Sequence, residues 1–404
     1  KLKKGLIFGL LAGISVGMSE LIWGGGVIMF LIISGAVLFE FLLGKINTNK
    51  FYIFSLWLLS SVVIMIPFST RYTLMGLIGS VSTGLSFIIF FVLLLDMLIF
   101  EKKVFNIHKK LEKIKLPQRV ISIIISGILI ILLASAFFGI SFIPNMAKSI
   151  ISDTLQPLNQ NRFSVTVAEN KQPYFTSDWA GEFGPAIFNV PLYFWLFFIG
   201  SVFMFNYLIR LSGKKERIIL TFSYVLFLIC LIFSKYSEGS IFNGTSTISF
   251  IVYLGGFLCF VGSLCYFYYK RYKEGKLSIF AELNFGYILY LVALTMAVIA
   301  SRGAVRLIMV LGAISPIAVG FLIVHISKTY FKEKEETKKL FIGILTLIIL
   351  IASIFTLWSY YQNDNSLADN FAPNYYTQQW QKAMAWVREN TSQNAVFAHW
   401  WDYG

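Results

Sequence analysis

Long apolar runs separated by short polar segments dominate this sequence. About twenty consecutive apolar residues cross the ~30 Å hydrocarbon core of a bilayer as one α-helix. Eleven runs have roughly this length, so the pattern predicts an all-α polytopic membrane protein with about eleven transmembrane helices. The runs cover residues 5–22, 27–43, 51–67, 76–100, 119–142, 187–210, 218–235, 248–269, 283–300, 304–326 and 340–358.

Composition agrees with a membrane location, and charge adds an orientation. Apolar residues make up 57% of the 404 residues and charged residues only 13%, too little polar surface for a soluble protein. The net charge of +14 falls mainly on alternate connections. These hold 25 of the 34 lysines and arginines, at the N-terminus and at 45–50, 101–119, 210–217, 270–276 and 328–339. This bias predicts that these connections are cytoplasmic, and it argues against a nucleic-acid partner.

Two connections on the opposite, extracytoplasmic side stand out. The loop 143–186 mixes aromatic residues, carboxylates and prolines, and it is too polar to enter lipid. A loop of this length in a compact protein is usually functional or disordered, and the many aromatic residues disfavour disorder. The second connection, 236–247, is a short hairpin.

After residue 358 the chain leaves the membrane for good, again on the extracytoplasmic side. A polar linker is followed by apolar residues at helical spacing, which predict a helix that ends near Asn390. Residues 395–398 then read as a short buried strand. The chain therefore divides into a transmembrane domain, residues 1–358, and the start of an extracytoplasmic α/β domain, residues 359–404.

The most specific motif is Trp400-Trp401-Asp402-Tyr403-Gly404. The indole N–H groups only donate hydrogen bonds and the carboxylate only accepts them, so together they suit a hydroxyl group. A plain alternative is an aromatic patch at a domain edge. The motif resembles the WWDYG motif of oligosaccharyltransferase catalytic subunits of the archaeal type. The resemblance implies that Trp400, Trp401 and Asp402 bind the Ser/Thr hydroxyl of an acceptor Asn-x-Ser/Thr sequon.

The external loop contains Thr166-Val167-Ala168-Glu169, which resembles the short Thr/Ser-x-x-Glu motif of the same family. The resemblance implies that Glu169 is a catalytic residue and a ligand of Mn²⁺ or Mg²⁺, ions for which carboxylate oxygen is a suitable donor. A solvated loop glutamate is the alternative.

A third motif, Ser301 to Met309, includes Arg302 and Arg306 and is similar to the family's VRLM segment. The resemblance implies that Arg306 contacts the pyrophosphate of the lipid carrier, with Arg302 assisting, whereas an arginine at a span end is otherwise a snorkelling anchor. Trp23-Gly24-Gly25 resembles the family's WGG turn and carries no chemistry.

Taken together, the resemblance implies a GT-C fold and a metal-dependent inverting glycosyltransferase. It would transfer an oligosaccharide from a polyprenyl (dolichyl) phosphate or pyrophosphate carrier in the cell membrane to sequon asparagines. The family's two acidic motifs belong upstream of Trp23, so we expect this chain to be a fragment without the N-terminal spans and most of the C-terminal domain. More residues separate Glu169 from Arg306 than in the family pattern, which suggests an extra helix pair around 218–269. Another polyprenyl-phosphate-dependent GT-C enzyme, such as a mannosyltransferase, stays open, and a transporter is disfavoured because no internal repeat is visible.

Overall fold

A computed structural model describes residues 2–111, 113–155, 171–179, 181, 183, 186, 190–370 and 378–397. The described helices of the first half are α1 (Leu2–Ile22), η1 (Gly24–Val27), α2 (Ile28–Leu42), α3 (Thr48–Met65), α4 (Leu74–Gly79), α5 (Val81–Asp96), η2 (Met97–Glu101), η3 (Val104–Asn106), α6 (His108–Leu111), α7 (Gln118–Phe138) and α8 (Phe142–Leu155). Those of the second half are η5 (Phe175–Trp179), α11 (Leu192–Leu208), α12 (Lys214–Phe233), α13 (Thr247–Lys273), η6 (Leu277–Glu282), α14 (Phe285–Ser301), η7 (Val305–Leu307), α15 (Ile308–Lys332), α16 (Glu336–Asn370) and α17 (Gln378–Asn390).

The helices confirm an all-α polytopic membrane protein. Within the described residues, nine helices are long and apolar enough to cross a bilayer. Two shorter apolar helices, α11 and α14, fall on the predicted runs 187–210 and 283–300. Nine of the eleven predicted runs therefore form helices of membrane-spanning length, and the other two form shorter apolar helices. The run 76–100 is broken at Ser80, whose extended backbone separates α4 from α5.

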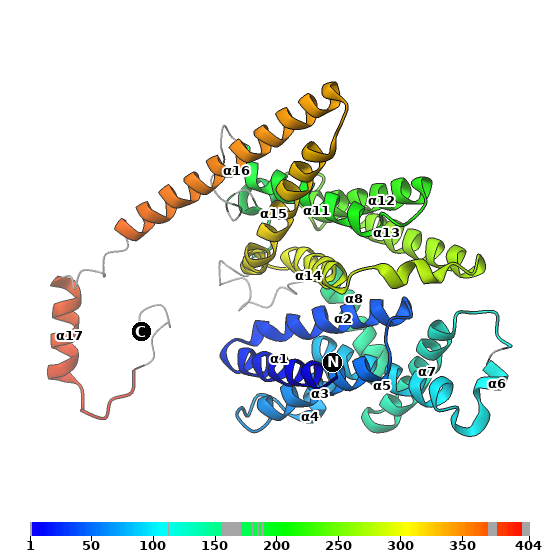
Figure 1. Ribbon diagram of the computed structural model, residues 1–404. Helices are drawn as coiled ribbons and strands as arrows, with labels where there is room; N and C mark the ends of the chain where they lie inside the picture. The colour runs from blue at the N-terminus through cyan, green and yellow to red at the C-terminus, as the bar shows by residue number, and fades with distance from the viewer. Residues whose placement is uncertain are drawn as a thin grey trace.

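Most of the described helices form two bundles, each with its own apolar core (Figure 1). Aromatic rings such as Phe30 and Trp57 fill the core of the N-terminal bundle, which α1–α7 form. The C-terminal bundle, which α11–α16 form, is filled around Phe194 and Tyr224. The bundles meet where α2 faces α14, and a methyl group on Gly35 would lie 2.9 Å from Val292 Cγ1. This glycine is needed for close helix approach.

The segment after the last span differs from the prediction. Helix α16 runs on through Asn370, so the first part of the predicted polar linker is helical. Helix α17 confirms the predicted helix and ends at Asn390. The predicted buried strand is wrong for residues 395–397, which form no strand, and the Val396 side chain is 96% exposed. A strand needs a hydrogen-bonded neighbour, and the described residues contain only isolated bridges.

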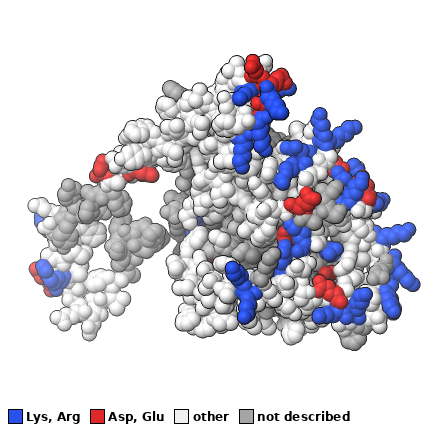
Figure 2. Space-filling model, viewed as in Figure 1, with Lys and Arg blue, Asp and Glu red and all other residues white. Residues whose placement is uncertain are grey.

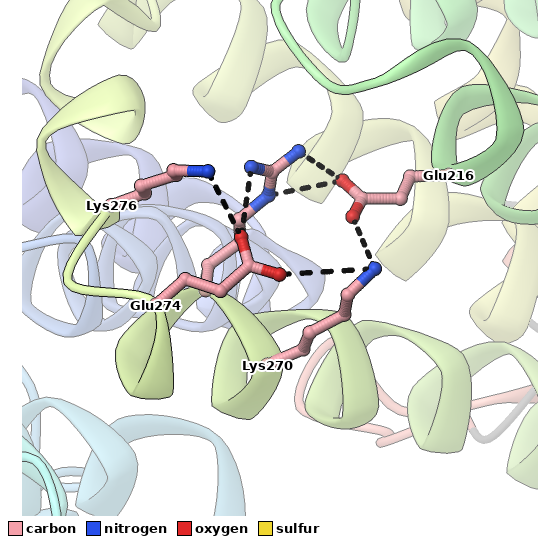
Figure 3. A network of polar contacts seen from close by, with 5 residues as sticks. Glu216, Lys270, Glu274 and Lys276 are labelled. Carbon is pink, nitrogen blue, oxygen red and sulfur yellow. Dashed lines mark hydrogen bonds and ion pairs between the residues drawn. The ribbon is translucent and has the colours of Figure 1, made fainter.

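Charged residues mark one end of the helices. Figure 2 shows Lys and Arg gathered mainly at the right and the top of the view, over α6, the right-hand ends of α12 and α13, and the connection between α15 and α16. There Glu216 at the start of α12 binds Lys270 at 3.0 Å and Arg271 at 2.5 Å near the end of α13 (Figure 3). Glu274 in turn contacts Arg271 at 3.3 Å and Lys276 at 3.6 Å. This network joins α12 and α13 at the end remote from their connecting loop.

Candidate functional site

Three connections meet at the opposite end of the α12–α13 hairpin. They are residues 171–179 of the long loop, residues 234–246 between α12 and α13, and residues 301–307 between α14 and α15. The amide of Val305 donates to the carbonyl of Lys171 at 3.0 Å, and the amide of Phe175 donates to the carbonyl of Lys235 at 2.9 Å. Backbone bonds therefore fix segments that lie far apart in the sequence.

Segment 171–179 is ordered by its own aspartate. Asp178 Oδ2 accepts hydrogen bonds from the amide of Tyr174 at 2.8 Å and the hydroxyl of Ser177 at 2.7 Å. Its Oδ1 pairs with Lys171 Nζ at 2.8 Å. Burial alone would raise the pKa of the Asp178 carboxyl, but these three donors outweigh it and hold the pKa below its usual value.

Aromatic packing fastens the same segment to the bundle. The Phe175 ring lies 5.1 Å from that of Phe194 on α11 and 4.5 Å from that of Phe233 at the end of α12. Trp179 stacks on Phe183, and both side chains are buried. Segment 171–179 is therefore anchored both by backbone bonds and by apolar contact.

Arg302 is buried in this junction, with 5% of the residue exposed. Its Nη1 donates to the Leu231 carbonyl at 3.2 Å and to the hydroxyl of Ser234. Its guanidinium lies 4.2 Å from the centre of the Tyr253 ring, a cation–π contact. Burial lowers the pKa of Arg302 to about 10, which still leaves it charged. The resemblance implied that Arg302 assists in contacting phosphate. In the structure its Nη1 points to α12 and the face of its guanidinium lies against α13.

Lys235 lies beside it and is 2% exposed. Its Nζ donates to the Arg302 carbonyl at 2.7 Å. Burial, together with the nearby Arg302 charge, lowers the pKa of Lys235 to about 6. Among the described residues neither Arg302 nor Lys235 has an ion pair with a carboxylate. The sequence analysis did not identify Lys235, which is the last residue of the predicted run 218–235. The only signal for a functional role was a basic residue at the end of an apolar run.

Arg306 has a different environment. It lies on the single turn η7 with its side chain exposed, next to the bond from Val305 to Lys171. The structure thus brings Arg306 together with the segment that follows Glu169 by two positions in the sequence. Glu169 itself lies outside the described residues.

Trp400, Trp401 and Asp402 also lie outside them, so the sequon-binding prediction stays a prediction. Within the described part of the chain, no group of three or more His, Cys, Asp or Glu side chains could hold a metal ion.

The WGG turn belongs to the N-terminal bundle and is closely packed. A methyl group on Gly24 would lie 2.4 Å from Arg71 Nη1, and one on Gly26 would lie 2.8 Å from Glu20 Oε1. None of these glycines has positive φ, so the turn does not require the backbone freedom of glycine. Glu20 is buried and receives a hydrogen bond from Tyr72 to its carbonyl oxygen at 3.2 Å.

No family model, no curated protein and no solved structure matches this chain.

Proposed function

We propose that this chain is the membrane-embedded part of an oligosaccharyltransferase, which transfers an oligosaccharide from a polyprenyl-phosphate carrier to asparagine in Asn-x-Ser/Thr. The observation that supports the proposal most strongly is the bond from the Val305 amide to the Lys171 carbonyl. It joins Val305, next to Arg306, to Lys171, which follows Glu169 by two positions and lies 134 positions (305 minus 171) before Val305. An enzyme of this kind must bring its metal-binding loop to the phosphate that leaves, and these are the two segments proposed for those tasks.

Each proposed residue has a chemical task. The exposed guanidinium of Arg306 presents fixed N–H donors that match phosphate oxygens and would stabilise the negative charge of the departing phosphate. Trp400, Trp401 and Asp402 would bind the sequon hydroxyl, and a site built to bind a hydroxyl rejects an analogue without it. Mn²⁺ or Mg²⁺, with Glu169 as one ligand, would supply Lewis-acid stabilisation of the phosphate.

The proposal also fixes an orientation. The junction would face the extracytoplasmic side of the cell membrane, and the lysine-rich connections at the other end of the hairpin would face the cytoplasm. Helix α12 has 20 residues, so at 1.5 Å per residue it separates the two ends by about 30 Å. That length matches the hydrocarbon core of a bilayer.

A transfer assay tests the proposal with Arg306→Ala in the full-length protein. The assay supplies a polyprenyl-linked oligosaccharide, Mn²⁺ and an Asn-x-Thr peptide. Loss of a preorganised donor to a developing charge should lower kcat by on the order of 100-fold. Arg210→Ala, an exposed arginine beyond α11 near the basic end of the helices, should leave kcat unchanged.

Equal rates for Arg306→Ala and wild type would remove Arg306 from the site. A wild-type protein that glycosylates a polyprenyl-linked sugar but no peptide would favour the mannosyltransferase-like alternative.

A further inference from the structure

Within the α12–α13 hairpin, Lys235 bonds to two segments of the candidate site. The backbone carbonyl of Lys235 accepts the Phe175 amide at 2.9 Å, and its side chain donates to the Arg302 carbonyl at 2.7 Å. The next residue, Tyr236, accepts the Thr176 amide at 3.2 Å. Lys235 therefore contacts two segments of the junction. Its main-chain carbonyl bonds to segment 171–179, and its side-chain nitrogen bonds to segment 301–307.

The bond to Arg302 has a clear physical reason. Arg302 caps the C-terminus of α14, where the last carbonyls of a helix have no partner within the helix. A lysine amine is a suitable donor for such a carbonyl. Since Arg302 is buried, removing the amine would leave its carbonyl without a water molecule to replace the bond, and an unsatisfied buried acceptor is destabilising.

Gly244 makes room for this arrangement. It has a φ of +80°, and a methyl group there would lie 2.6 Å from Lys235 Cγ. Its amide donates to Ser249 Oγ at 3.1 Å, at the start of α13. The loop thus folds its own glycine over the lysine stem, which fixes the direction of the side chain toward α14.

We propose that Lys235 is a positioning residue, which holds Arg306 at a fixed place relative to segment 171–176. The role rests on the proposed function. It would also give α12 and α13, the helix pair that the sequence analysis identified as an extra one, a task at the site. The Arg302 carbonyl accepts the bond from Lys235, and Arg306 follows four residues later in the sequence, on η7. A shift of the Arg302 carbonyl would therefore move Arg306, and misplacement by about 1 Å can cost 100-fold in rate.

The test compares wild type with Lys235→Met in the full-length protein, since methionine keeps most of the stem and removes the donor. Hydrogen exchange should become about fivefold faster or more at the amides of Phe175 and Val305, which report the two backbone bonds of the junction. In the transfer assay kcat per folded molecule should fall about 10- to 100-fold, while the KM for the acceptor peptide stays within twofold. A purely structural role would lower the yield of folded protein and leave kcat unchanged.

A second variant covers the case in which Lys235→Met does not fold. Gly244→Ala keeps the lysine and displaces its stem, and it should reproduce both effects. Gly239→Ala controls for an added methyl group in the same loop, because a methyl group there meets nothing within 4 Å.

Unchanged exchange at Phe175 and Val305, or faster exchange with an unchanged kcat, would overturn the positioning role. A wild-type protein without peptide transfer would instead refute the proposed function. The exchange measurement would then still decide whether Lys235 joins the two segments.

Discussion

Gly256 of α13 faces Cys230 of α12 so closely that a methyl group on the glycine would lie 2.4 Å from the Cys230 Cβ. The neighbouring Gly255 points elsewhere, and a methyl group there meets nothing within 4 Å. The two glycines have the same helical propensity but opposite surroundings. They therefore report how much the close packing of the α12–α13 hairpin contributes to the stability of the whole C-terminal bundle.

Gly256→Ala should destabilise the protein by about 1–3 kcal/mol, because α12 and α13 must separate to admit the methyl group. Gly255→Ala should be neutral or stabilise the protein by up to about 1 kcal/mol, since alanine is the better helix former. The thermal midpoint of each purified variant, followed by size-exclusion chromatography after heating, measures the difference. Equal midpoints for the two variants would mean that the helices do not pack at Gly256.

Asp178→Asn should loosen segment 171–179 by about 1–2 kcal/mol at neutral pH, because a charged acceptor for Lys171, Tyr174 and Ser177 becomes neutral. Hydrogen exchange of the Tyr174 amide, corrected for its intrinsic rate, measures this opening. Asp364→Asn, at an exposed aspartate on α16, is the control and should leave that amide unchanged.

The same aspartate predicts a pH dependence. The pKa of Asp178 is lowered in the folded protein, so its contribution to stability is complete above the unfolded pKa of about 3.9 and is lost as the pH falls through the lower folded value. The difference between wild type and Asp178→Asn should therefore be constant from neutral pH to about 5 and disappear in acid. A difference that fades between pH 7 and 5 would contradict this assignment.

The membrane orientation can be tested with single cysteines. Glu238→Cys lies in the α12–α13 loop and Lys109→Cys in α6, and both positions are exposed. In a background with alanine at Cys230, Cys259 and Cys265, a membrane-impermeant maleimide should label position 238 from outside intact cells. It should label position 109 only after the membrane is opened. Labelling of both positions from the same side would contradict the prediction that the chain crosses the membrane an odd number of times between them.

The helices were predictable because their signal is local. A run of about twenty apolar residues carries its own reason to be a helix in lipid, where every backbone group must be bonded within the segment. The junction was not predictable in this way. The bond from Lys235 to the Arg302 carbonyl spans 67 positions, and hydropathy does not distinguish a lysine that reaches water from one that caps a buried helix end.

The C-terminal differences also have physical reasons. Residues 359–370 are polar, but no proline interrupts them before Pro373, so the helix of the last span can continue to Asn370. Residues 395–397 have apolar side chains suited to a strand. Strand formation depends on a partner elsewhere, and a local pattern says nothing about that partner.

Glu169 is the proposed residue whose role can be separated from the others by a single titration. Glu169→Gln keeps the shape of the side chain and one acceptor oxygen but removes the negative charge. Attraction between a hard dication and its oxygen ligands is largely electrostatic. In the full-length protein, the Mn²⁺ concentration for half-maximal transfer should therefore rise by on the order of tenfold, as measured with an Asn-x-Thr peptide at saturating lipid-linked donor.

Two comparisons make that titration specific. Glu238→Gln removes the same charge from an exposed position in the neighbouring loop, and its metal dependence should match that of wild type. Asp402→Ala should abolish transfer at every metal concentration, because the acceptor for the sequon hydroxyl is lost. In Glu169→Gln the KM for the peptide should stay unchanged, since Trp400, Trp401 and Asp402 are intact. Superimposable Mn²⁺ curves for Glu169→Gln and wild type would show that Glu169 is a solvated loop residue and that the ion is held elsewhere.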